Sequence, residues 1–318
     1  MMKEVVAGID IGGTNTVIGL VDRDGNIPVE KNLLTASYTD VQDFVNAIEK
    51  TIFELQKEAG NVMLKGVGIG APNGNYYKGT IERATNLIWK GIIPLSEMIK
   101  SGTSLPVALT NDANAAAVGE MIFGAAKGMK DFIVLTLGTG LGSGIVINGQ
   151  LVYGHTGFAG ELGHIIIVPG GRACGCGCNG CLETYASATG LVRTTLFLMT
   201  EMREETPLRN IAPSQLTAKM VSEAAIKNDP IALKAFDFTG EKLAHGIANA
   251  VVFSSPQAIF LFGGLANAGD LLFVPVRKYI DKYIMPTFKG TFEILPSGIK
   301  ESNAAVLGAA AVAWNELA

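Results

Sequence analysis

The chain has 318 residues, of which 48% are hydrophobic and 17% are charged, and its formal net charge at pH 7 is −4. This composition indicates a globular protein and excludes a disordered chain, and the acidic balance disfavours a broad nucleic-acid-binding surface. The length exceeds what a single core usually serves, so we expect two domains with a cleft between them.

The sequence shows no signal for export or for membrane insertion. Residues 1–7 lack the basic start and the long apolar run of a signal peptide. The most apolar late segment, residues 304–314, is about half as long as the roughly 20 residues that a membrane-spanning helix needs. We therefore expect a cytoplasmic protein whose partners include neither a membrane nor a nucleic acid.

The predicted elements alternate between strands and helices, which is typical of the α/β class. Strands are predicted at residues 5–9, 16–21, 27–34, 67–69, 132–137, 143–147, 150–153 and 259–262. The first helix begins at a capping box of Thr39 and Gln42 and ends at Gly60. Later helices are predicted at residues 112–123, 191–203, 214–227, 230–253 and 304–318.

One supersecondary unit occurs twice. The first strand leads into Asp10-Ile11-Gly12-Gly13-Thr14 and a second strand, and the strand at 132–137 leads into Gly138-Thr139-Gly140-Leu141-Gly142 and another strand. A repeat of this size indicates two related domains, each with one sheet. We place the N-terminal domain at residues 1–111 plus about 304–318, and the C-terminal domain at residues 112–303.

Both Gly-rich segments are suited to bind phosphate. Glycine lets the backbone approach a ligand closely, backbone amides can hold phosphate oxygens, and Asp10 can hold Mg²⁺ through water. For the first segment alone, a tight hairpin with a hydrogen-bonded aspartate is the alternative. Two such loops related by a repeat favour a polyphosphate ligand.

All four cysteines of the chain lie within eight residues, and His164 precedes the first of them by ten. In a reducing compartment this clustering favours metal binding over disulfides. One imidazole and three thiolates, from His164, Cys174, Cys176 and Cys181, would make a tetrahedral zinc site in the loop 164–181. Four protein ligands leave no open position, so the zinc would be structural. A four-cysteine site that uses Cys178 and omits His164 is the alternative.

These segments, together with the run from Gly157-Phe158-Ala159-Gly160-Glu161-Leu162-Gly163-His164 through Cys181-Leu182-Glu183, resemble the ROK family of bacterial sugar kinases and sugar-responsive repressors. The likeness extends from Val5 to Asn303-Ala304-Ala305-Val306-Leu307-Gly308-Ala309-Ala310, nearly the whole chain. It implies the duplicated two-domain actin-like ATPase fold, also called ribonuclease H-like, with a sugar and ATP bound in the cleft between the domains.

The resemblance also implies roles for particular residues. Asp112 corresponds to the catalytic aspartate that accepts the proton of the sugar hydroxyl, and its place before an Ala-rich helix also suits a helix cap, as does that of Asn111. The implied sugar ligands are Asn86, Asn111, Asp112, Glu161, His164 and Glu183. The implied nucleotide-binding residues are Asp10, Gly12, Gly13, Thr14, Gly138, Thr139, Gly140, Gly263 and Gly264.

Two of these assignments have plain alternatives. Each glutamate, taken singly, is as typical of a solvated surface charge as of a sugar ligand. Gly263-Gly264 resembles the adenosine-binding turn of the family, and an ordinary strand-to-helix turn is the alternative. Two positions depart from the family pattern, because Ser143 stands where a third glycine is common and Pro72-Asn73-Gly74 replaces a Pro-Gly pair. The second departure leaves the sugar preference open.

We therefore expect a homodimeric hexose kinase that uses ATP, Mg²⁺ and structural zinc to convert glucose to glucose 6-phosphate. Kinases of the same family for N-acetylhexosamine, mannose or fructose are alternatives. A sugar-responsive transcriptional regulator is disfavoured because the first strand starts at Val5, which leaves no room ahead of it for a helix-turn-helix. A non-catalytic sugar-binding protein is disfavoured because plain binding needs no phosphate cradle.

Overall fold

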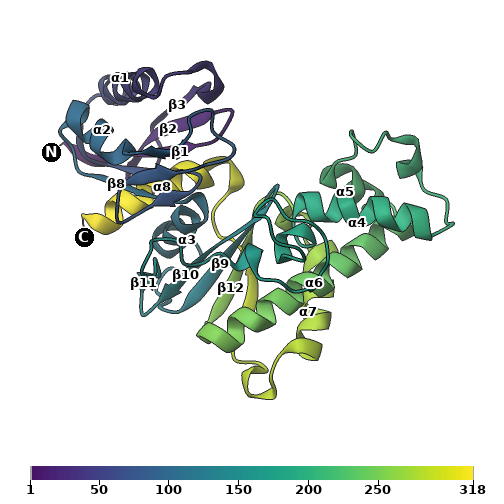
Figure 1. Ribbon diagram of the computed structural model, residues 1–318. Helices are drawn as coiled ribbons and strands as arrows, with labels where there is room; N and C mark the ends of the chain where they lie inside the picture. Colours follow the sequence, from purple (N-terminus) through teal and green to yellow (C-terminus); the bar gives the residue numbers. More distant parts are fainter. Residues whose placement is uncertain (1, 318) are drawn as a thin grey trace. The chain divides into compact units, whose positions relative to one another are not determined.

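The computed structural model describes residues 2–317, without the side chains of residues 301–303. The chain folds into two compact units, whose elements can be followed in Figure 1. The first unit holds the chain up to Met129, the segment Gly144–Gly160 and the chain from Ser297 onward. The second unit holds Lys130–Ser143 and Glu161–Pro296. The domain limits expected from the sequence, at residues 111 and 112 and near residue 304, stay a prediction.

A five-stranded sheet is the centre of the first unit. Its order is β3-β2-β1-β4-β8, with β1 (Lys3–Ile11), β2 (Thr16–Asp22), β3 (Val29–Leu33), β4 (Val62–Gly70) and β8 (Val107–Thr110). Side chains of a strand point alternately to the two faces of its sheet. Accordingly Val5 and Ile9 of β1 pack in the core that includes α1 (Val41–Ala59), whereas Val6 packs in the core that includes α8 (Glu301–Glu316). The sheet is therefore covered by helices on both faces.

Helix α8 lies very close to this sheet. A β-carbon at Gly8 would collide with the backbone oxygen of Val306, and one at Gly68 would collide with that of Ala309. Glycine is needed at both positions because the helix backbone occupies the space of a side chain. The last helix of the chain is thus packed directly on β1 and β4.

A second five-stranded sheet has the order β11-β10-β9-β12-β13. Its strands are β9 (Phe132–Leu137), β10 (Leu141–Ile147), β11 (Gln150–Leu151), β12 (Ala258–Phe262) and β13 (Glu293–Pro296). In each sheet the second strand of the repeat pairs antiparallel with the third, β2 with β3 and β10 with β11. The first strand of the repeat runs parallel to a later strand, β1 to β4 and β9 to β12. The two sheets therefore share one topology, which confirms the repeat predicted from the Gly-rich segments.

The remaining helices and strands lie outside these two sheets. The α-helices are α2 (Leu95–Thr103), α3 (Asp112–Phe123), α4 (Ala188–Glu201), α5 (Ala218–Ile226), α6 (Pro230–Ser254) and α7 (Asp270–Tyr283). A small sheet contains β5 (Gly74–Asn75), β6 (Thr80–Glu82) and β7 (Ile92–Ile93). The 3₁₀ helices are η1 (Thr35–Ser37), η2 (Leu162–His164), η3 (Leu182–Thr184), η4 (Pro207–Asn210), η5 (Ala266–Ala268) and η6 (Pro286–Phe288).

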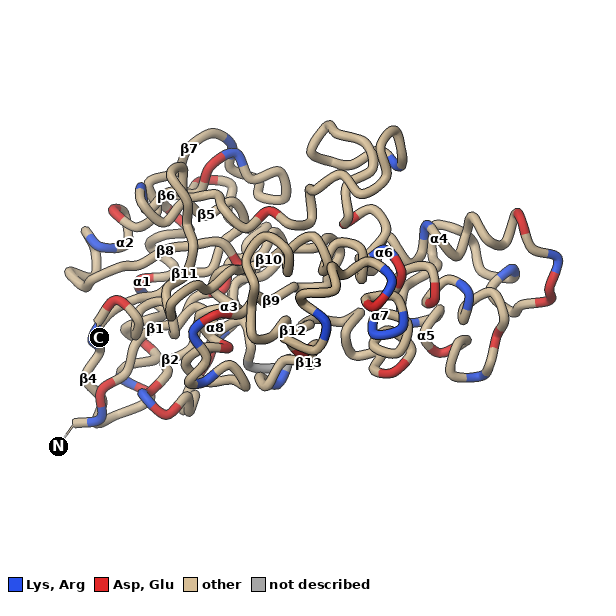
Figure 2. The backbone as a smooth tube through the Cα atoms, turned by 90° about the horizontal axis from the view of Figure 1, so that it is seen from below, with Lys and Arg blue, Asp and Glu red and all other residues tan. Residues whose placement is uncertain are grey.

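Charged side chains form ion pairs between α6 and α7, and Figure 2 shows blue and red segments of the tube near both labels. Lys278 Nζ lies 2.9 Å from Asp237 Oδ1, and Lys282 Nζ lies 3.5 Å from Glu241 Oε1. Such exposed pairs contribute about 1 kcal/mol or less each to stability, so they support the helix pair without determining it. Within residues 2–317, no helix is both long and apolar enough to span a bilayer.

Helix boundaries differ from the predicted ones where side-chain caps decide them. The N-cap of α1 is Asp40, whose carboxylate accepts hydrogen bonds from the backbone N–H groups of Gln42 and Asp43, so the predicted cap at Thr39 is wrong by one residue. Ser187 and Thr217 cap α4 and α5 in the same way and shift their starts from the predicted ones. Helices α2 and α7 were not predicted, and α7 contains an interior proline, which ordinarily argues against a helix.

Candidate active site and metal centre

The first Gly-rich hairpin lies between β1 and β2 in the first unit. Gly12 N–H donates to Asn15 O at 2.9 Å, which closes the turn. A β-carbon at Gly13 would collide with the backbone oxygen of Asn86, so the segment that carries this predicted sugar ligand runs directly against the hairpin. Thr14 and Asn86 are both exposed. The structure therefore brings the predicted phosphate hairpin and one predicted sugar ligand together.

Two acidic residues, Asp10 and Asp112, lie close together beside Gly70. A β-carbon at Gly70 would lie 3.8 Å from Asp10 Oδ1 and 3.8 Å from Asp112 Cα. Burial, and secondly the charge of Asp112, raise the pKa of Asp10 to about 6. Loss of hydration raises the pKa of Asp112 although the residue has exposed surface, and the backbone N–H of Ala113 partly opposes this rise. The described lysine and arginine side chains form no ion pair with either carboxylate, so the pair suits a bound cation.

Asn111 and Asp112 have separate tasks at the start of α3. Asn111 Oδ1 accepts a hydrogen bond from Asn114 N at 2.6 Å and is the N-cap of the helix. Asp112 Oδ1 accepts a local hydrogen bond from Ala113 N at 2.8 Å. Asn111 is therefore the N-cap, a role that the sequence allowed for either residue, and Asp112 is not the N-cap of α3.

The second Gly-rich hairpin joins β9 to β10 and is closed by a bond from Gly138 N–H to Gly140 O at 3.1 Å. Ala188 N, in the first turn of α4, donates to Gly138 O at 2.9 Å. A β-carbon at Gly138 would meet no atom within 4 Å, whereas one at Gly140 would lie 2.6 Å from Glu183 Oε2. Thr139 is exposed. One side of this hairpin is thus open to a ligand, and the other side contacts a predicted sugar ligand.

A pocket of 480 Å³ lies beside the turn at Gly263-Gly264, which follows β12. Its lining includes Lys219, Ser222 and Ile226 of α5, with Gly264 and Asn267. Ala188 also lines it, and Ala188 is the residue that binds Gly138 O. A ligand here would lie at the carboxyl end of a parallel strand, a frequent nucleotide position in α/β proteins. The sequence pointed to the turn but gave no signal for the α5 residues, because a lysine, a serine and an isoleucine on a helix match no motif.

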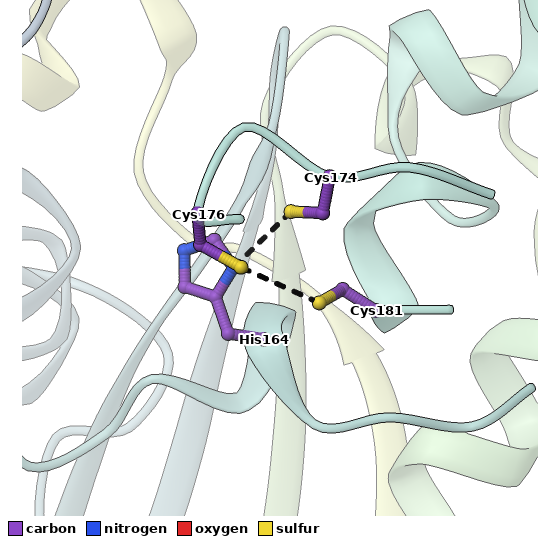
Figure 3. A group of neighbouring side chains, drawn as sticks. All are labelled: His164, Cys174, Cys176 and Cys181. Carbon is purple, nitrogen blue, oxygen red and sulfur yellow. Dashed lines mark hydrogen bonds between the residues drawn. The ribbon is translucent and has the colours of Figure 1, made fainter. Parts of the chain in front are cut away.

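The predicted metal ligands converge in the second unit, as Figure 3 shows for His164, Cys174, Cys176 and Cys181. One ligand atom from each lies within 4.8 Å of the others. Cys176 Sγ is 3.6 Å from Cys181 Sγ, and Cys174 Sγ is 3.6 Å from His164 Nδ1. Tetrahedral zinc with ordinary bond lengths separates two sulfurs by about 3.8 Å and a sulfur from a nitrogen by about 3.6 Å. The donor set and its spacing fit zinc.

Cys178 lies outside this cluster, although it is close in sequence. Its thiol is exposed and is not one of the four ligand atoms that lie close together. Its backbone oxygen accepts a hydrogen bond from Cys174 N at 3.0 Å. The backbone N–H of Cys178 also lowers the pKa of Cys176 to about 7, which favours the thiolate that a metal needs. The arrangement supports the set with His164 over the four-cysteine alternative.

His164 lies between the metal cluster and the two predicted sugar-binding glutamates. Its Nδ1 faces Cys174, and its Nε2 lies 3.9 Å from Glu161 Oε2. Glu183 Oε1 lies 3.8 Å from His164 Nδ1 and accepts a hydrogen bond from Cys174 Sγ at 2.9 Å. The structure thus brings Glu161, His164 and Glu183 together around one imidazole.

The two departures from the family pattern have structural explanations. Asn73 has a left-handed backbone with φ 51°, which asparagine tolerates better than most residues, and its Nδ2 donates to Glu82 O at 3.0 Å. Ser143 Oγ accepts from Leu162 N at 3.1 Å. Asn73 therefore shapes a turn, and Ser143 joins the second hairpin to the segment of Glu161 and His164, a role that sequence reasoning missed.

Two sheets of one topology, each with a Gly-rich hairpin after its first strand, define a protein of the actin-like ATPase class. A model of the ROK family matches residues 6–316, so the chain belongs to the ROK family. It is 36% identical to a glucokinase of Thermotoga maritima over 98% of both chains. It is 30% identical to a xylose repressor of Caldicellulosiruptor bescii, over 98% of this chain and 78% of the repressor.

A solved structure agrees with this assignment. The ROK family glucokinase from Streptomyces griseus, in complex with glucose and AMPPNP, is similar with a TM-score of 0.80 and 33% sequence identity. The similarity covers 96% of this chain and 98% of that one. The fold class predicted from the sequence is thereby confirmed.

Proposed function

We propose that this protein transfers the γ-phosphoryl group of ATP to a hydroxyl of glucose and releases ADP and glucose 6-phosphate. One observation carries the proposal: Asp112 presents a carboxylate that is not used as a helix cap, next to Asp10 at the end of a Gly-rich hairpin. The glucokinases of Thermotoga maritima and Streptomyces griseus support glucose as the acceptor.

In this mechanism Asp112 is the general base. Its carboxylate accepts the hydroxyl proton while the sugar oxygen bonds to the γ-phosphorus and the bond from that phosphorus to the bridging oxygen of ADP breaks. A raised pKa makes the carboxylate a stronger base than an ordinary aspartate. Asp10 is the residue that would hold Mg²⁺ through water, and the ion would offset the charge of the phosphates.

The remaining predicted residues bind the two substrates. The amides of Gly12, Gly13, Gly138 and Gly140 and the hydroxyls of Thr14 and Thr139 hold the phosphates, and the turn at Gly263-Gly264 with its pocket holds the adenosine. The sugar hydroxyls are bound by Asn86, Asn111, Asp112, Glu161, His164 and Glu183. Carboxylate, amide and imidazole groups together offer the donors and acceptors that a polyol requires.

The zinc site supports the sugar ligands. His164, Cys174, Cys176 and Cys181 would hold the ion, and Nε2 of His164 lies on the side of the predicted sugar ligand Glu161. Four protein ligands leave the ion without an open position, so its task is structural. We further propose that the protein acts in the cytoplasm as a homodimer, as the family resemblance implies.

An ADP-release assay over a panel of hexoses tests the proposal. Glucose, mannose, fructose and N-acetylglucosamine would each be tested with ATP and Mg²⁺. We expect the highest kcat/KM with glucose. A higher kcat/KM for another hexose would make that hexose the substrate in place of glucose. If no hexose led to ADP release, the assignment as a kinase would be refuted.

A further inference from the structure

The second Gly-rich hairpin touches the sugar-ligand segments at three places along its length. Gly140 lies against the carboxylate of Glu183, where a β-carbon would lie 2.6 Å from Oε2. A β-carbon at Gly163 would collide with the backbone oxygen of Leu141. Ser143 Oγ accepts a hydrogen bond from Leu162 N at 3.1 Å. All of these residues belong to one compact unit.

These contacts differ in kind. The two glycine contacts set how closely the segments approach, because a side chain would push them apart. The bond of Ser143 is directional, since one hydroxyl oxygen fixes the position of one backbone amide. Ser143 is 2% exposed and lies in β10, so protein packs around its hydroxyl.

The backbone amide that donates to Ser143 belongs to Leu162, in the middle of a segment that carries two predicted sugar ligands. Leu162 opens η2, with Glu161 directly before it and His164 at the end of the same short helix. Moving Leu162 would therefore move a predicted sugar ligand on each side. Glycine, which is common at position 143 in the family pattern, has no hydroxyl and cannot make this bond, so the bond is a feature of this chain.

We propose that Ser143 is a positioning residue that holds Glu161 and His164 for the sugar and couples sugar binding to occupancy of the phosphate hairpin. Nucleotide binding restrains the hairpin, the hairpin continues into β10, and Ser143 passes the restraint to Leu162. By linkage, each ligand then strengthens the binding of the other by the same factor. The inference rests on the proposed function, because it assigns the two ligands to these segments.

Ser143→Ala tests the proposal, with Thr206→Val as the matched control. Thr206 is also buried, and its hydroxyl accepts a hydrogen bond from the backbone N–H of Leu208 at 3.2 Å. Neither residue is a predicted ligand. Glucose binding would be titrated by calorimetry with and without AMPPNP, and kcat, KM and zinc content would be measured. Ser143→Gly provides a second variant without the hydroxyl.

We expect Ser143→Ala and Ser143→Gly to weaken glucose binding about fivefold, the typical value of one hydrogen bond. AMPPNP should strengthen glucose binding in the parent and strengthen it clearly less in either variant, while zinc content stays at the parent level. Parent-like affinity and coupling in the variants would overturn the proposal, as would the same losses in Thr206→Val. A parent that binds glucose without phosphorylating it would instead count against the proposed function and leave the test of Ser143 intact.

Discussion

Gly138→Ala separates phosphate binding from folding. A β-carbon at this position meets no atom within 4 Å, and the backbone is not left-handed, so we expect the free energy of unfolding to change by about 0.5 kcal/mol or less. The methyl group would occupy the open side of the hairpin, where the proposed function places the phosphate oxygens. One hydrogen bond to a charged group contributes about 1.5–3 kcal/mol, so losing it should raise the KM for ATP roughly 10- to 100-fold.

Steady-state kinetics with thermal melting would measure this effect. The KM for glucose should stay within about twofold of the parent value, because a β-carbon at Gly138 would meet no atom of Glu183 within 4 Å. Gly175→Ala is the matched control, since Gly175 also has open space and no left-handed backbone but lies in the metal loop. Gly140→Ala should instead disturb both substrates, because its β-carbon would lie 2.6 Å from Glu183 Oε2. A folded Gly138→Ala protein with a parent-like KM for ATP would refute this placement of the phosphates.

Two further predictions concern the metal and the paired carboxylates. Cys176→Ser should abolish stoichiometric zinc binding and raise the KM for glucose, whereas Cys178→Ser should keep both near parent values. Elemental analysis and steady-state kinetics measure the two effects. Zinc loss in Cys178→Ser alone would reverse the ligand assignment. The pKa of Asp10 is raised to about 6 by burial and by Asp112, so the folded state binds more protons than the unfolded state between about pH 4 and pH 6, and stability falls as the pH rises through this window. Asp10→Asn should therefore stabilise the protein by on the order of 2 kcal/mol at pH 7.5 and have little effect at about pH 4, and equal shifts in Tm at both pH values would contradict this.

The parts of the fold that the sequence predicted well have strong local signals. The repeated strand-glycine-strand pattern indicated two sheets of one topology, and the helix at 112–123 was predicted with the bounds of α3. The cysteine spacing identified the members of the metal cluster because zinc ligands must lie close together whatever the surrounding fold.

The features that the sequence did not predict depend on tertiary contacts. Helix α7 contains Pro275, and its packing on α6 outweighs the local preference against a helix. The hydrogen bond from Leu162 N to Ser143 joins residues 19 positions apart, and no spacing rule relates them. The raised pKa of Asp10 likewise depends on burial and secondly on the charge of Asp112, a residue that is distant in the chain and adjacent only in the fold.

The most direct test of the central claim compares kcat for Asp112→Asn and Asp229→Asn. Both aspartates stand at the start of a helix, but Asp229 caps α6, where it accepts from Ala232 N at 2.8 Å, and asparagine can replace it as a cap. Asp112→Asn should keep the fold and the glucose affinity and lower kcat by about 100-fold or more, as expected for the loss of a positioned base, while Asp229→Asn stays near the parent. Near-parent turnover in Asp112→Asn would contradict the assignment of Asp112 as the base.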